Sequence, residues 1–253
     1  MSRLPSFPLA IFVLSLAFLW LAVRLGSFLS GKLRQLTDGE RKDLDLVTGA
    51  CLTLLALVIG FTFSMAVSRY DQRKNYEEEE ANAIGTEYVR ADLLPAVDGE
   101  RVRQLLMQYL DQRLLFYTVR DHRRVEVIES ETAKLQNAMW TIVQSAAKAQ
   151  PTPVVSLVVA GMNDVLNRQG YTQAAWWNRI PVGAWTLMAT LSFCCSALIG
   201  YGAHQRSTLL FMIVPFLVSI AFFLIADIDS PRRGIIRVAP QNLISLSQSL
   251  HKH

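Results

Sequence analysis

Four long stretches of this sequence carry almost no charged side chains, whereas charges crowd into the region from Ser68 to Arg179. A soluble domain mixes charged and apolar residues at the scale of a helical turn, so segregation over tens of residues indicates a lipid bilayer. A helix that crosses a bilayer needs about 20 mostly apolar residues, and each stretch is long enough. We therefore predict an integral membrane protein with four transmembrane helices.

The expected spans cover about residues 9–29, 46–67, 182–203 and 208–228. The first contains one charged residue, Arg24, which is close enough to the end of the span for its side chain to reach the headgroups. A cleaved signal peptide is the alternative for this stretch, but Trp20 and Arg24 stand where its small-residue cleavage site should lie. Pro215 falls inside the fourth span and predicts a kink there.

Four spans place both termini and the long central segment on one side of the membrane. Basic residues near the spans decide which side, because cytoplasmic loops are enriched in Lys and Arg. They number nine on the side of the termini and five on the other: Arg3, Arg69, Arg73, Lys74, Arg168, Arg179, Arg232, Arg233 and Arg237, against Lys32, Arg34, Arg41, Lys42 and Arg206. We expect a multi-pass protein of the inner (plasma) membrane with both termini cytoplasmic.

Beyond Ser68 the chain becomes charged but keeps the pattern of a helix, without proline and with a single glycine before Pro95. Span two should therefore continue out of the membrane as one long helix that ends before Pro95. The turn after it runs to Gly99, with Asp98 as the N-cap of the next helix.

Three further helices are expected before span three, over about 100–120, 124–149 and 154–167. The first is amphipathic, because its apolar residues recur every three or four positions. A strand over 154–159 is the alternative for the start of the last helix. Trp176 and Trp177 follow, and such a pair is typical of an aromatic belt at the membrane surface.

The predicted fold class is therefore all-α. The chain divides into a transmembrane hairpin (1–67), a cytoplasmic helical region (68–180), a second transmembrane hairpin (181–229) and a C-terminal tail with a short helix (230–253). A helix that continues out of a membrane span tends to be a contact between subunits, so we also expect self-association.

No motif for catalysis or for a cofactor is present in the sequence. It has no GxSxG, HExxH or Walker-type pattern, and its three cysteines and four histidines are not spaced as metal ligands. The net charge of +4 is modest and forms no basic face interleaved with aromatic residues, which nucleic-acid binding requires. We expect no enzyme, no catalytic residue, no metal or cofactor site and no nucleic-acid partner.

A run of glutamates on the expected long helix is the first cluster of candidate site residues. Glu80 ends the run, and Glu87 lies near the same helix face. Repeated by symmetry around an axis, these carboxylates can concentrate cations or tune a pore mouth. A solvated helix face is the alternative.

The second cluster follows the fourth span. Asp227 should be paired with Arg232 or Arg233, because an unpaired carboxylate at the end of a span is costly. Asp229 completes the charge cluster. The alternative is a structural helix end, with Ser230 as the N-cap of a new turn.

Three stretches resemble the prokaryotic membrane proteins described as bestrophin-like: GFTFSMAVSRYDQR (60–73), EEANAIGTEYVRADLLP (79–95) with YLDQRLLFY (109–117), and LIADIDSPRRGIIRV (224–238). The similarity extends over the whole four-span layout. True bestrophins are pentameric anion channels in which span two lines a pore narrowed by a phenylalanine-rich neck. Their calcium-binding acids have no residue-by-residue counterpart here.

The resemblance implies a homo-oligomeric ion channel, with a pentamer and anion conduction as the expectation and span two lining the pore. Ile59 and Phe63, four residues apart on one helix face, are then the pore-lining candidates. Membrane lipid, further copies of the chain and small ions are the expected partners. The alternative is a non-conducting membrane scaffold or sensor whose cytoplasmic helices bind a partner.

Overall fold

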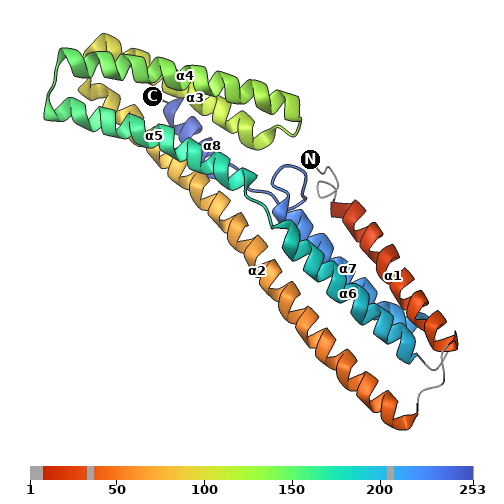
Figure 1. Ribbon diagram of the computed structural model, residues 1–253. Helices are drawn as coiled ribbons and strands as arrows, with labels where there is room; N and C mark the ends of the chain where they lie inside the picture. The colour runs from red at the N-terminus through yellow and green to blue at the C-terminus, as the bar shows by residue number, and fades with distance from the viewer. Residues whose placement is uncertain (1–7, 33–36, 204–207, 253) are drawn as a thin grey trace. The chain divides into compact units, whose positions relative to one another are not determined.

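The computed structural model describes residues 8–32, 37–203 and 208–252. Within these ranges the fold is all-α, as the sequence predicts (Figure 1). Its elements are α1 (Pro8–Lys32), α2 (Asp38–Arg90), the 3-10 turn η2 (Ala91–Leu93), α3 (Ala96–Thr118), α4 (His122–Ala149), α5 (Pro153–Trp177), α6 (Val182–Gly202), α7 (Thr208–Asp229) and α8 (Gln241–Leu250). Arg3, Arg34 and Arg206, which enter the charge comparison, lie outside the described residues.

Four helical stretches are long and apolar enough to cross a membrane, over 8–32, 38–93, 153–202 and 211–229. The chain divides into two compact units. The first holds the described residues of 1–69 and 179–237, and the second holds residues 70–178 and the described part of 238–253. The long helix predicted to continue beyond span two is confirmed, because α2 runs without interruption over 53 residues.

In the first unit, α1, α6 and α7 lie side by side (Figure 1). Glycines allow α1 and α6 to approach closely, because a Cβ on Gly26 would stand 2.0 Å from the Ala197 carbonyl oxygen. A Cβ on Gly200 would stand 2.1 Å from the carbonyl oxygen of Val23. The Ser27 hydroxyl donates to the Gly200 carbonyl oxygen at the same crossing (3.1 Å). Small residues and an interhelical hydrogen bond thus join α1 and α6, as is typical within a membrane.

The second unit surrounds one hydrophobic core, to which α2, α3, α4, α5 and α8 contribute. The amphipathic face predicted over 100–120 is confirmed, since its apolar residues are buried or packed against the core: Val102, Leu105, Leu106, Tyr109, Leu110, Leu114 and Tyr117. Phe116, Tyr117 and Trp176 form an aromatic cluster, in which the Trp176 ring centroid lies 4.9 Å from that of Phe116 and 5.4 Å from that of Tyr117.

The predicted N-cap at Asp98 is wrong. Helix α3 begins at Ala96 with Pro95 as its N-cap, so Asp98 lies in the first turn. A negative charge there is favoured by the helix dipole, which explains the acid at this position without a capping hydrogen bond.

The helix predicted over about 154–167 is confirmed as part of α5, whereas the alternative of a strand over 154–159 is wrong. Residues 154–159 form no strand, because the Thr152 hydroxyl accepts from the Val155 amide (3.2 Å) and Pro153 occupies the first turn, which together start a helix. The helix then runs to Trp177 and not only to residue 167. Trp176 is buried in the aromatic cluster, whereas Trp177 is exposed, so only Trp177 fits the predicted belt.

Candidate functional site

One face of α2 carries buried charges through the second unit. Positions three or four apart share a helix face, and this spacing joins six buried side chains: Arg73, Glu77, Glu80, Ile84 and Glu87 of α2, followed by Ala91 at the start of η2. We call these six residues the α2 stripe. A buried charge needs a partner or must be neutralised. The interpretation of the glutamate run as a solvated face is therefore wrong for Glu77 and Glu80.

Glu80 is paired with Arg113 of α3. Both side chains are fully buried, and the guanidinium donates to both carboxylate oxygens, from Nε to Oε1 and from Nη2 to Oε2. The hydroxyls of Tyr117 and Thr172 donate to Oε2 as well, at 3.4 and 3.2 Å. Burial and the Glu80 charge raise the pKa of Tyr117, so its phenol keeps the proton that it donates. This network joins α2 to α3 and α5.

Two further members of the α2 stripe hold the ends of other helices. The Glu77 carboxylate accepts from the Leu243 amide (2.9 Å) and from the side-chain amide of Asn242 (2.7 Å). It thereby caps the N-terminus of α8 and attaches the C-terminal helix to α2. The Nε of Arg73 donates to the Ala175 carbonyl oxygen (3.2 Å) near the end of α5.

Glu87 differs from the other glutamates of the α2 stripe. Its side chain is fully buried, and among the residues that the structure describes neither carboxylate oxygen has a hydrogen-bond partner. Burial raises the pKa of Glu87 to about 8, with a lowering contribution from Arg90 and a raising one from Asp164. The carboxylate lies against Gly161 of α5, where a Cβ would stand 2.0 Å from Glu87 Oε2.

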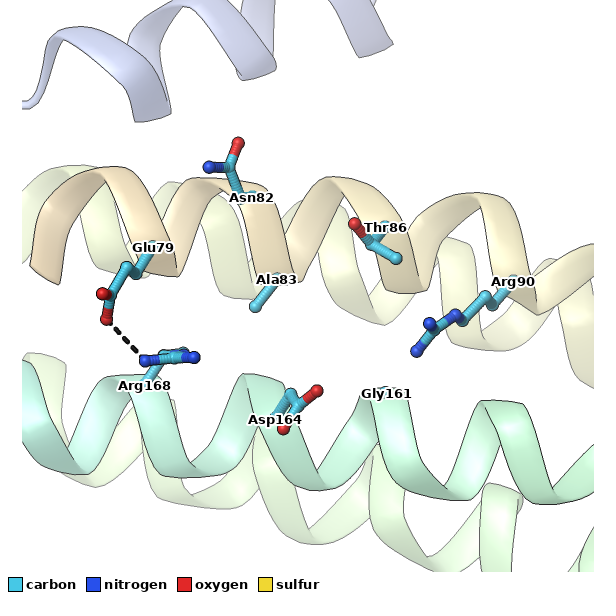
Figure 2. Close-up of a pocket in the computed structure, with 8 residues that line it drawn as sticks. All are labelled: Glu79, Asn82, Ala83, Thr86, Arg90, Gly161, Asp164 and Arg168. Carbon is cyan, nitrogen blue, oxygen red and sulfur yellow. Dashed lines mark hydrogen bonds and ion pairs between the residues drawn. The ribbon is translucent and has the colours of Figure 1, made fainter.

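A pocket of about 380 Å³ lies between α2 and α5 (Figure 2). Its walls carry charges of both signs and consist of Glu79, Asn82, Ala83, Thr86, Arg90, Gly161, Asp164 and Arg168. Arg168 donates to Glu79 across the pocket (2.5 Å). Figure 2 shows Arg90 extending from α2 toward Gly161, and Asp164 directed from α5 toward α2.

The carboxylates at the end of α7 fasten neighbouring segments of the chain. Both Asp227 oxygens accept from main-chain amides, Oδ1 from Ile235 (2.7 Å) and Oδ2 from Ile236 (2.8 Å). Both Asp229 oxygens accept from the Ile180 amide at 3.2 Å, just before α6. Asp227 and Asp229 are therefore buried anchors within the first unit.

The alternative interpretation of this segment, a helix end followed by a new turn at Ser230, is confirmed. Residues 231–233 form a turn, which the Gly234 amide closes by donating to the Ser230 carbonyl oxygen (3.0 Å). From the sequence we expected Arg232 or Arg233 as the partner of Asp227. The two main-chain amides that donate to its carboxylate were not expected. Arg232 is half-buried and Arg233 is exposed. Gly234 makes the turn compact, since a Cβ there would stand 2.3 Å from the Asp227 carbonyl oxygen.

The apolar part of α2 holds the two pore-lining candidates. Ile59 is half-buried and the Phe63 side chain is 39% exposed. Phe61 is 66% exposed and, at about 100° per residue, points to the opposite side of the helix. The structure thus places Ile59 and Phe63 on one side of α2 and Phe61 on the other.

A family model for the bestrophin-like domain matches residues 9–243. The chain belongs to the bestrophin-like family. Solved structures with the same fold include three single-residue variants of a bacterial bestrophin homologue from Klebsiella pneumoniae, with TM-scores of 0.66, 0.65 and 0.66. Their sequences are 13%, 12% and 14% identical to this chain. The structural matches include 97%, 100% and 95% of this chain, and 98%, 97% and 98% of the Klebsiella chains. No curated protein sequence matches the chain.

Sequence reasoning missed Arg113 and Gly161 in this bestrophin-like chain. Arg113 lies in phase with Tyr109, Leu110 and Phe116 on the buried face of α3. A charged residue in phase with an apolar face is a signal for a buried ion pair, and it was available in the sequence. Gly161 carries no such signal, because its role depends on the side chain that α2 places opposite it.

Proposed function

We propose that this bestrophin-like protein forms a homo-oligomeric ion channel, with a pentamer and anion conduction as the specific form. The observation that carries the proposal is the family match over residues 9–243. Bestrophins are channels of this four-span design, and no enzymatic role is proposed. The shared fold along nearly the whole chain supports the same assignment.

We further propose that α2 lines the pore. Within the first unit α2 is covered along a narrow strip, formed by Leu55, Thr62 and Ala66. Large apolar side chains elsewhere on it stay exposed: Leu46, Val47, Leu54, Leu57, Phe61, Phe63 and Met65. A helix covered on one side has surface left for neighbouring copies. A ring of Ile59 and Phe63 side chains would restrict ions by dewetting, since apolar walls offer water too few hydrogen bonds.

Orientation belongs to the same proposal. We place the protein in the inner membrane, with the second unit and both termini in the cytoplasm, on the strength of the excess of basic residues on that side. The boundaries between transmembrane hairpins and cytoplasmic region, after residues 67, 180 and 229, stay predictions.

An oligomer structure is the test of this function. We expect native mass spectrometry in mild detergent to give five copies, and a cryo-electron microscopy map to show a continuous path along an axis lined by α2. Another closed ring would keep the channel and correct the number of subunits. A monomer, or an axis filled with lipid or side chains from end to end, would favour the non-conducting scaffold.

A further inference from the structure

We propose that Glu87 is a proton-binding site that controls the contact between α2 and α5. Protonated, its carboxyl group rests against Gly161. Deprotonated, it draws the Arg90 guanidinium away from α5 and loosens the contact. The proposal stands on the contacts of the second unit and does not depend on ion conduction.

Gly161 makes the place for the Glu87 carboxyl group. A Cβ at this position would stand 2.0 Å from Glu87 Oε2 and 3.1 Å from Glu87 Cδ. Any other residue in α5 at this position would displace the carboxyl group from the crossing. The two helices therefore fit together around a glutamate side chain that forms no hydrogen bond with any part of the chain that the structure describes.

The other glutamates of the α2 stripe show how this chain supplies hydrogen-bond donors to a buried carboxylate. Glu77 receives two N–H donors at the start of α8. Glu80 receives the Arg113 guanidinium and two hydroxyl groups. Glu87 lies on the same face and is equally buried, yet no donor in the described ranges of the chain reaches it. A carboxyl group without donors is stable in such a place only in its neutral, protonated form.

Two charged groups act on Glu87: Arg90 on its own helix and Asp164 on α5. The Nη1 atom of Arg90 donates to the Leu157 carbonyl oxygen of α5 (3.3 Å). The same atom would lie 2.6 Å from a Cβ on Gly161, which makes it a near neighbour of Glu87 Oε2 (Figure 2 shows Arg90 and Gly161). When Glu87 loses its proton, its carboxylate becomes a charged acceptor for Arg90 in place of the Leu157 carbonyl oxygen. The new negative charge is also repelled by Asp164.

The pH at which the site acts follows from the raised pKa. An ordinary glutamate has a pKa near 4.5, whereas burial raises the pKa of Glu87 to about 8. The folded chain therefore holds this proton more tightly than the unfolded chain does. The contribution of Glu87 to stability is fully present below the lower pKa, falls as the pH rises to about 8, and is constant above.

The proton can be observed directly in the wild-type chain. With ¹³C-labelled glutamate in the full-length protein in lipid nanodiscs, we expect one side-chain carboxyl carbon to titrate with a midpoint near 8. This signal should be missing from Glu87→Gln and present in Glu78→Gln, which removes an exposed carboxylate of the same helix. The midpoint should rise in Arg90→Gln and fall in Asp164→Asn. If no glutamate titrates above about pH 6, the site does not exist.

The effect on the helix contact needs a second measurement. At about pH 9, hydrogen exchange of α5 amides should be faster in the wild type than in Glu87→Gln, and at about pH 4, below the ordinary pKa of a glutamate, the two should agree. Comparison at equal pH removes the chemical effect of pH on exchange. Equal exchange at both pH values, with a confirmed titration of Glu87, would overturn the control of the α2–α5 contact.

Discussion

Removing the charge of Glu80 tests the buried network that joins three helices of the second unit. Glu80→Gln keeps the shape of the side chain but leaves the Arg113 guanidinium buried without a counter-charge. Both side chains are fully buried in the structure, so water cannot replace the lost partner. Breaking a buried ion pair on one side costs about 3–5 kcal/mol. For a chain of this size, that corresponds to a melting temperature lower by roughly 10 °C.

Thermal unfolding of the detergent-solubilised protein measures this effect. Glu78→Gln is the matched control, because it removes an exposed carboxylate two residues away and should change stability by less than about 0.5 kcal/mol. Arg113→Gln should be as harmful as Glu80→Gln. The double variant should lose less stability than the sum of the two single variants, since it leaves no buried charge without a partner.

Additivity would refute the reasoning. If the double variant loses the full sum of the single effects, Glu80 and Arg113 do not interact, and the role of the network in joining α2 to α3 is wrong. Single variants that melt with the wild type would have the same meaning.

Three further predictions concern the first unit and the orientation of the chain. Asp227→Asn should lower the melting temperature more than Glu78→Gln does, because one main-chain donor loses its acceptor at about 1–3 kcal/mol, and equal effects would contradict the role of Asp227 as an anchor. Gly200→Ala should destabilise the α1–α6 contact, seen as a lower melting temperature, whereas Gly60→Ala, with open space around it, should have little effect. Cysteines introduced at Asp38 and Asp98 should label from opposite sides of the membrane, with the one at Asp98 cytoplasmic; labelling from one side would contradict the assignment of the spans.

The fold was predictable because its largest features follow from composition over long windows. Four stretches with almost no charged side chains indicated the spans, and the absence of proline between Ser68 and Pro95 indicated the length of α2. Local starts of helices were less predictable. Thr152 and Pro153 together start α5 before a β-branched run, and Pro95 starts α3 without any side-chain cap.

The candidate site was predictable only in part. The spacing of Glu77, Glu80 and Glu87 places them on one helix face. However, a run of acidic residues has the same sequence pattern whether that face is exposed to solvent or buried. The partners that decide this come from distant parts of the chain: Arg113 lies 33 residues from Glu80, and Leu243 lies 166 residues from Glu77. Such pairs depend on tertiary packing, which a single sequence does not encode in local periodicity.

The central claim, that α2 lines an ion pore, is tested most directly by currents in planar bilayers. Phe63→Ala would widen an apolar ring in every subunit at once, so we predict larger or constitutive currents than in the wild type. Ile59→Ala should act in the same direction, and Phe61→Ala, on the opposite side of α2, should change the current far less. Currents opened by Phe61→Ala and not by Phe63→Ala would assign the pore to the other face of α2. Silence of the wild type and all three variants under varied voltage, calcium and pH would contradict the channel and leave the scaffold.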